Sequence, residues 1–188
     1  MPAWRTALRR QGVAAGVEHA GVMRNPGPVR TVVDIGANRG QFALVARYCF
    51  RDARIVSFEP LTGPAALWRA VFASDGLATL EEAAVGPQAV DAEIHVSARD
   101  DSSSLLPIAA RQSALFPGTA EAGTATIRVQ RLADALPAED IAALVDDAEW
   151  RAALGAAARS YAESDLAQEA IMARFEQDAE ALVGGASR

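Results

Sequence analysis

The sequence predicts an α/β fold organised around a parallel sheet, and one stretch of the chain carries most of this prediction. Residues 31–35 form an apolar run rich in β-branched side chains, which is typical of a buried strand. A turn that contains Gly36 and Gly40 follows, and residues 41–50 have the apolar spacing of a helix. A strand, a glycine turn and a helix in this order open a βαβ nucleotide-binding unit.

The glycine turn predicts a binding site for an anionic or polar group. Gly36 permits a sharp change of direction, and Gly40 lets the helix pack closely against the strand. The middle position of the usual three-glycine pattern is Asn38, which tolerates the left-handed backbone conformation better than most residues. Backbone amides at the start of the helix would then face the ligand.

A second predicted strand, residues 54–58, ends at an acidic residue with suitable spacing. Glu59 lies 19 residues after Gly40. This is close to the interval of roughly 20 residues at which such folds place a carboxylate against ribose hydroxyls. We therefore expect Glu59 to accept hydrogen bonds from a ribose. The alternative is an ordinary solvated carboxylate at the end of a strand.

The segments on either side of these two strands extend the pattern. Residues 1–23 predict one or two short helices, with Trp4 as an apolar anchor, that end at residues 25–28. After Glu59, Pro64 predicts the first turn of a helix. That helix is expected to bury Leu67 and Val71 and to end at Asp75 and Gly76.

Three more strands are expected. Residues 77–85 predict a third parallel strand, which completes a βαβαβ unit with right-handed crossovers. Apolar and polar side chains alternate over residues 92–97 and 124–130. We expect both segments to extend the same sheet, with residues 31–35 at its centre.

Composition limits the classes of function. A chain of 188 residues suits one domain with a small appendage, and a net charge of −6 argues against a nucleic acid or an anionic membrane as partner. The sequence contains no lysine, which excludes lysine-based catalysis and a P-loop. No segment has the apolar length of a signal peptide or a membrane span, so a cytoplasmic location without membrane insertion is expected.

Cysteine and histidine provide no pattern for a metal site. Cys49 is the only cysteine, and its spacing from Phe42 and Val45 predicts a core thiol. The two histidines, His19 and His95, are far apart in sequence and lack the spacing of metal ligands, so no metal is expected.

Four motifs together resemble one known family. They are residues 33–42, residues 57–60, residues 84–86 and the polar cluster 101–105. In this order and spacing, over about residues 29–132, they are similar to the FkbM family of S-adenosylmethionine-dependent methyltransferases. The resemblance implies a Rossmann-like class I methyltransferase fold. It also implies O-methylation of a hydroxyl on a sugar, a glycan or another natural product.

The resemblance also implies a set of site residues. Those expected around S-adenosylmethionine, with Glu59 on the ribose and the last three near the adenine, are Asp34, Gly36, Ala37, Asn38, Gly40, Gln41, Glu59, Pro60, Ala84 and Val85. Those expected on the substrate side are Asp101, Ser102 and Ser103. A polar cluster of this kind commonly hydrogen-bonds its own loop, which is the competing interpretation. The catalytic base is not identified: Asp100 and Asp101 are candidates, with a loop-capping role as the preferred interpretation of both.

The C-terminal part departs from the family. The strand that should follow residues 127–130 carries a Lys-Ile-Asp-x-Glu-Gly signature in the family, and this sequence has no Asp-x-Glu-Gly. Residues 139–183 are instead similar to the C-terminal helices of retaining GT-B glycosyltransferases, and predict two amphipathic helices that pack rather than transfer a sugar. The expected domains are therefore 1–28, a helical segment; 29–136, a truncated methyltransferase domain; and 137–188, a helical tail.

Three functions remain open at this point. The first is methyl transfer to a small-molecule or glycan acceptor. The second is a nicotinamide-dependent oxidoreductase, against which Asn38 and the lack of a Tyr-x-x-x-Lys pair both count. The third is a non-catalytic remnant that binds a cofactor or a partner. The missing strand predicts weak or absent catalysis, together with either self-association through an exposed sheet edge or shielding of that edge by the tail.

Overall fold

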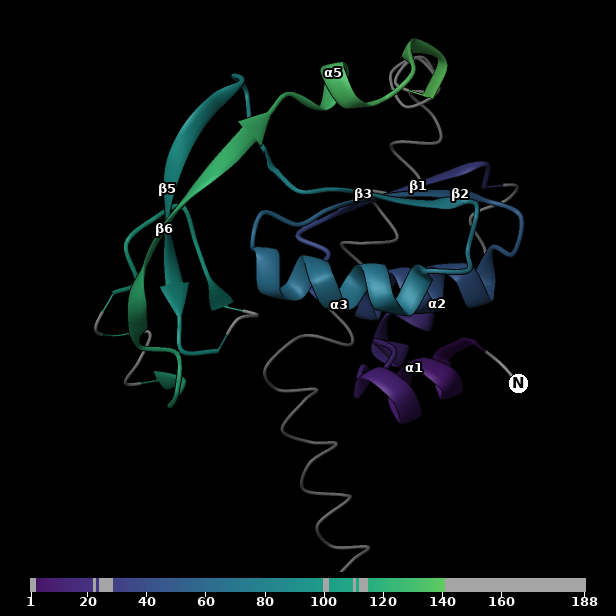
Figure 1. Ribbon diagram of the computed structural model, residues 1–188, viewed down its shortest axis with the longest axis horizontal. Coiled ribbons are helices and arrows are strands. Elements are labelled where there is room, and N and C mark those ends of the chain that lie inside the picture. Colours follow the sequence, from purple (N-terminus) through teal and green to yellow (C-terminus); the bar gives the residue numbers. More distant parts are fainter. Residues whose placement is uncertain are drawn as a thin grey trace, which may run out of the picture. The chain divides into compact units, whose positions relative to one another are not determined.

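The computed structural model describes residues 3–21, 23, 29–99, 102–109, 111 and 115–140 (Figure 1). The chain divides into two compact units, residues 1–141 and 142–188, and the described residues all belong to the first. The predicted tail helices beyond residue 141, the predicted stop at 25–28, and Asp100 and Asp101 lie outside the described residues.

The predicted parallel sheet is present. It contains β1 (Thr31–Ile35), β2 (Arg54–Phe58) and β3 (Ala78–Glu81), in the order β1-β2-β3. Both pairings are parallel, so the carboxyl ends of β1 and β2 lie side by side. The prediction that the first strand is central is wrong for the described part of the chain. There β2 is central and β1 has a strand on one side only, because no described later strand returns to pair with it.

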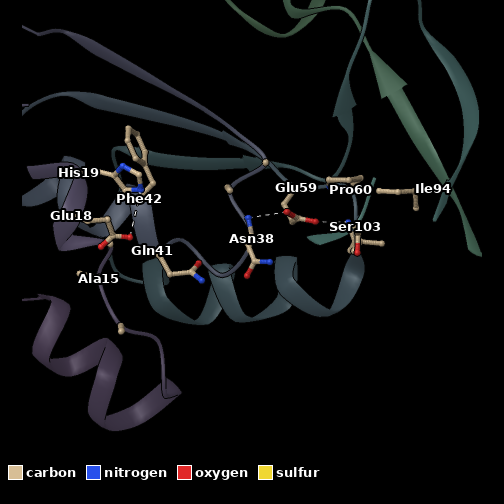
Figure 2. A pocket seen from close by; sticks show the side chains of 15 residues that line it. Ala15, Glu18, His19, Asn38, Gln41, Phe42, Glu59, Pro60, Ile94 and Ser103 are labelled. Carbon is tan, nitrogen blue, oxygen red and sulfur yellow. Dashed lines mark hydrogen bonds and ion pairs between the residues drawn. The ribbon is translucent and has the colours of Figure 1, made fainter. Parts of the chain in front are cut away.

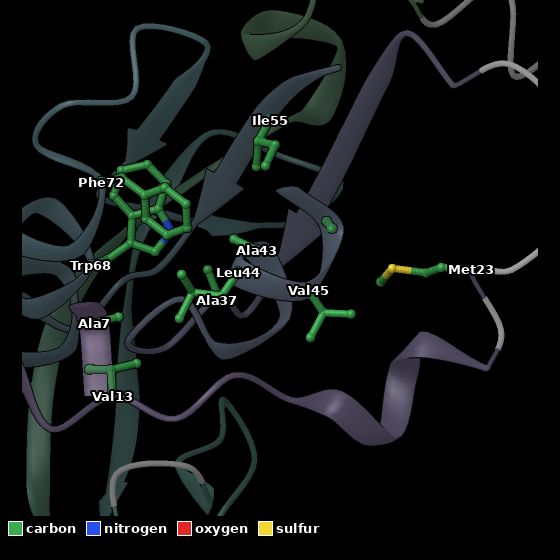
Figure 3. Close-up of a cluster of buried hydrophobic side chains, with 11 residues drawn as sticks. Ala7, Val13, Met23, Ala37, Ala43, Leu44, Val45, Ile55, Trp68 and Phe72 are labelled. Carbon is green, nitrogen blue, oxygen red and sulfur yellow. The ribbon is translucent and has the colours of Figure 1, made fainter. Parts of the chain in front are cut away.

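Two helices cover one face of this sheet, and a third packs against both of them (Figure 1). The two on the sheet are α2 (Gln41–Cys49) and α3 (Thr62–Phe72), and the third is α1 (Ala3–Gln11). The short 3₁₀ helix η1 (Val17–Ala20) contacts α2. Figure 3 shows the buried cluster that they share with Ile55 of β2. Trp4 and Cys49 both pack against this cluster, as predicted.

The register of α3 differs from the prediction. Pro64 lies in the first turn as expected, but the helix begins two residues earlier, at Thr62. The side chains it buries include Trp68 and Phe72, while Leu67 is half-buried. The two aromatic rings stack with centroids 4.5 Å apart, so the larger apolar surfaces face the core and set the rotation of the helix.

The opposite face of the sheet is covered by a later segment. Val56 and Phe58 of β2 form a buried cluster with Leu136, which follows the short helix α5 (Leu132–Ala135). The carboxylate of Asp140 fixes the end of this segment to the sheet. It accepts hydrogen bonds from Thr31 Oγ1 at 3.0 Å and from Arg54 Nη1 at 3.2 Å.

The remaining strands form a second sheet. It has the order β4-β6-β5, with β4 (Ala84–Val85), β5 (Val90–Ser97) and β6 (Glu121–Gln130). The prediction of these strands is confirmed, but the prediction that they extend the first sheet is wrong. The predicted strand 77–85 is also divided, because β3 pairs with β2 whereas β4 pairs with β6.

The second sheet has its own core. β5 and β6 pair in antiparallel fashion over almost their full lengths, and Ile94, Ile127 and Val129 form a separate buried cluster. Gly86 lies so close to β6 that an added Cβ would approach the Val129 side chain to 2.6 Å. Alternation of apolar residues shows that a segment is a half-buried strand but does not identify its partner, which is why the sequence placed these strands in the first sheet. No described helix is long and apolar enough to cross a membrane.

Candidate functional site

The glycine turn after β1 adopts the backbone that its sequence predicts. Gly36, Asn38 and Gly40 have φ values of 79°, 48° and 90°, all in the left-handed region. The amides of Gly36 and Ala37 both donate to the carbonyl oxygen of Phe58 at 2.9 Å, which fastens the turn to the end of β2. The left-handed conformation expected of Asn38 is thereby confirmed.

Glu59 is buried where it holds this turn in place (Figure 2). The residue is 5 % exposed, so the alternative of a solvated carboxylate is wrong. Oε2 accepts a hydrogen bond from the amide of Asn38, and Oε1 accepts one from the amide of Leu61, both at 2.8 Å. The carboxylate therefore links the turn after β1 to the start of α3. A carboxylate offers about four lone-pair sites, more than these two backbone amides use.

Asp34 is a second buried carboxyl close to the turn. It is 6 % exposed, and its Oδ2 accepts a hydrogen bond from Ser57 Oγ at 3.3 Å. Burial raises the pKa of Asp34 to about 6; the Ser57 hydrogen bond opposes this rise, and the nearby charge of Glu59 adds to it. Asp34 therefore supports the end of β1 from inside the protein.

Asp34 should make stability depend on pH. Its pKa in the folded state, about 6, exceeds the ordinary value of 3.8, so the folded protein binds the proton more tightly than the unfolded chain. The resulting stabilisation is complete below pH 3.8 and is lost as pH rises through about 6, with a magnitude of about 2–3 kcal/mol. Asp34→Asn should abolish this loss. Urea unfolding at several pH values from 4 to 8 measures it, and parallel curves for both proteins would contradict the prediction.

A pocket of about 560 Å³ lies beside the turn (Figure 2). The predicted site residues that line it are Gly36, Ala37, Asn38, Gln41, Glu59, Pro60 and Ser103. The predicted site residues that are described but do not line it are Asp34, Gly40, Ala84, Val85 and Ser102. Asp101 lies outside the described residues.

Several predicted site residues that do not line the pocket make packing contacts elsewhere. Gly40 packs against Trp68 and Phe72, Ala84 packs on the core of the second sheet, and Val85 packs on the cluster around Phe58. The serine cluster bonds to its own loop, since Ser103 Oγ accepts from the amide of Ser97 and Ser104 Oγ accepts from that of Leu106. Ser103 reaches the pocket as part of this loop.

Sequence reasoning missed one complete wall of the pocket. The residues concerned are Ala14, Ala15, Gly16, Glu18 and His19 from the N-terminal segment, with Phe42, Leu61 and Ile94 elsewhere. The amide of Gly16 donates to the carbonyl oxygen of Gln41 at 2.9 Å, so this segment is tied to the first residue of α2. The one sequence feature that could have indicated this wall is Gly16, a glycine between two helical segments.

The pocket has chemically different ends. Figure 2 shows Pro60 and Ile94 on one side of Glu59, and Glu18, His19 and Phe42 on the other side. Among the described lining residues, the ionisable groups are Glu18, Glu59 and His19, and none is an arginine. This charge pattern favours a ligand that is neutral or cationic and carries hydroxyls over a dianionic diphosphate.

Among the described residues, no group of three or more histidine, cysteine, aspartate or glutamate side chains is placed to hold a metal ion. No family model matches this sequence, and the search of curated proteins finds no match to it.

Proposed function

We propose that this protein is a methyltransferase that uses S-adenosylmethionine to O-methylate a hydroxyl of a sugar, a glycan or another natural product. The observation that carries the proposal is the buried Glu59 carboxylate, which lies at the end of β2 and lines a pocket together with the glycine turn after β1. A parallel sheet binds ligands at the carboxyl ends of its strands, which is where this pocket lies.

The residues of the pocket fit the cofactor. Glu59 lines the pocket, and carboxylate oxygens are the acceptors that suit ribose hydroxyls. Pro60, Leu61 and Ile94 offer apolar surface for a flat purine. The turn and Gln41 would border the methionine part, where the Glu18 carboxylate suits a positive charge.

The contribution of the protein would be mainly positional. The bound cofactor supplies a methyl group on a sulfonium, which is already activated for transfer. The chain would hold the acceptor hydroxyl in line with that methyl and exclude competing water. Because His19 and Phe42 lie at one end of the pocket, this end is the natural place for the acceptor.

A nicotinamide-dependent oxidoreductase fits this pocket less well. Its cofactor carries a diphosphate, and the two carboxylates in the lining would repel that charge. A cofactor-binding protein without methyl transfer is the second candidate. The pairing of β1 favours this candidate. Among the described residues, β1 pairs with β2 alone. The family that the sequence resembles would place another strand on the other side of β1.

Binding measurements on Glu59 variants test the proposal. Glu59→Ala should weaken S-adenosylmethionine binding by tenfold or more, because charge-assisted hydrogen bonds contribute about 1.5–3 kcal/mol each. It should also destabilise the turn, since the amides of Asn38 and Leu61 lose their acceptor. Glu59→Gln keeps one acceptor oxygen, so it should lose less of the stability and of the affinity than Glu59→Ala does.

Titration calorimetry with S-adenosylmethionine, S-adenosylhomocysteine and NAD should show binding of the first two only. Glu93→Ala is the matched control, because Glu93 is exposed on β5 and does not line the pocket. Unchanged affinity in both Glu59 variants, or preferential binding of NAD, would rule the proposal out. Binding of both sulfur ligands without methyl transfer to any hydroxylated acceptor would favour the second candidate.

A further inference from the structure

A carboxylate and an imidazole lie together at one end of the pocket. Glu18 and His19, both in η1, line it, with Glu18 Oε1 3.7 Å from His19 Nε2. The His19 ring meets the ring of Phe42 edge to face, with centroids 5.4 Å apart and an interplanar angle of 67° (Figure 2). His19 is thus oriented from two sides while its side chain remains 48 % exposed and accessible to a ligand.

The backbone that carries this pair is fixed to the start of α2. The amide of Gly16 donates to the carbonyl oxygen of Gln41 at 2.9 Å. The amide of His19 donates to the carbonyl oxygen of Gly16 at 3.0 Å. A Cβ at Gly16 would lie 3.1 Å from His19 Cδ2 and 3.3 Å from Glu18 Oε1. Glycine at position 16 therefore lets both side chains fold back over the backbone toward the pocket.

The other histidine provides an internal comparison. His95 also pairs with a carboxylate, since its Nδ1 lies 2.9 Å from Glu121 Oε2. This pair joins β5 to β6 on the second sheet, and neither member lines the pocket. The protein thus contains two histidines, each beside a carboxylate, and one of them faces the proposed cofactor site.

We propose that His19 is the general base for methyl transfer and that Glu18 is its positioning residue. This inference rests on the proposed function. Because the Glu18 carboxylate lies on the Nε2 side of the ring, 3.7 Å away, we assign Nδ1 as the nitrogen that accepts the proton. As the acceptor oxygen forms its bond to the methyl carbon, the carbon–sulfur bond breaks and its electron pair stays on sulfur. The hydroxyl proton passes to His19 Nδ1, and the imidazolium, stabilised by Glu18, later releases it to water.

The test uses the charge difference between the two sulfur ligands. S-adenosylmethionine carries a positive charge at the reacting centre, and S-adenosylhomocysteine does not. A base that faces this centre should hold its own proton less tightly when the sulfonium is bound, because like charges within about 4–6 Å disfavour each other. The acceptor need not be known for this measurement. The charged groups that line the pocket with His19, namely Glu18 and Glu59, are the same in both complexes.

The measurement is the proton NMR titration of the imidazole C2–H, made in His95→Gln so that His19 is the only histidine. Its midpoint should lie about one pH unit lower with S-adenosylmethionine than with S-adenosylhomocysteine. In the matched control His19→Gln, the midpoint of His95 should be the same with both ligands. Glu18→Gln should reduce the difference in the His19 midpoint between the two ligands, whereas Glu121→Gln should leave it unchanged.

The outcomes separate this inference from the proposed function. Calorimetry on the same samples shows whether both ligands bind. If they bind and the His19 midpoint is the same with each, His19 does not face the reacting centre and the inference is overturned. If neither ligand binds, the proposed function fails first and the inference fails with it. If Glu18→Gln leaves the difference between the two His19 midpoints unchanged, Glu18 is not a positioning residue.

Discussion

Replacing Arg47 by alanine is expected to lower the free energy of unfolding by about 3–5 kcal/mol, because it removes a largely buried cation and leaves the acceptors of its hydrogen bonds without a donor. Arg47, near the end of α2, donates from Nε and Nη2 to the two carboxylate oxygens of Asp75, with the shorter distance 2.7 Å. Its Nη1 donates to the carbonyl oxygens of Phe50, Arg51 and Ala53. One side chain thus joins the end of α2, the turn into β2 and the turn before β3.

The size of the Arg47 effect follows from burial. The side chains of Arg47 and Asp75 are 14 % and 22 % exposed, so alanine would leave a carboxylate and three carbonyls poorly solvated. Arg47→Lys keeps the charge but not the fork of donors, and should cost less, about 1–3 kcal/mol. Urea unfolding monitored by circular dichroism measures both.

Arg69→Ala is the matched control for Arg47. Arg69 also donates to a carboxylate, that of Glu82, at 2.7 Å, but the two side chains are 49 % and 32 % exposed. An ion pair this exposed contributes about 0.2–1 kcal/mol. Equal losses for Arg47→Ala and Arg69→Ala would show that Arg47 does not join these turns as described.

The centre of the fold was predictable because its signals are local. The run 31–35, the turn with Gly36 and Asn38 and the strand 54–58 each depend on residues within a few positions of one another, and the structure confirms them. The position of Glu59 after the second strand was predicted from its spacing, and it lines the pocket. Its two backbone donors could not be predicted, because they depend on the path of the chain after β2.

The second sheet and the N-terminal wall were not predictable in the same way. Residues 92–97 and 124–130 were recognised as strands, but their partner is chosen by packing among Ile94, Ile127 and Val129 rather than by local preference. The pocket wall at 14–19 depends on a hydrogen bond from Gly16 to Gln41, across 25 residues of sequence. A contact of this separation has no periodic signature in either segment.

Gly40 belongs to the predicted glycine turn and also packs closely against α3. Its φ is 90°, a conformation that side-chain-bearing residues rarely adopt. It also faces α3 closely, because an added Cβ would lie 2.8 Å from Phe72 Cε2 and 2.9 Å from Trp68 Cδ1. Both rings are buried in the main core and stacked on each other, so neither can move without disturbing its neighbours.

Gly40→Ala is therefore expected to destabilise the protein by about 2–4 kcal/mol, from backbone strain and from overpacking together. Because α3 begins beside Leu61, whose amide binds Glu59, displacement of α3 should also weaken binding of S-adenosylhomocysteine. Gly63→Ala is the matched control. Gly63 lies in the first turn of α3 with nothing within 4 Å of an added Cβ, so alanine there should be neutral or stabilising by about 0.4–1 kcal/mol. Urea unfolding and titration calorimetry on both variants measure the two effects. If Gly40→Ala is as stable as Gly63→Ala, the close approach of the turn to α3 is not what requires glycine at position 40.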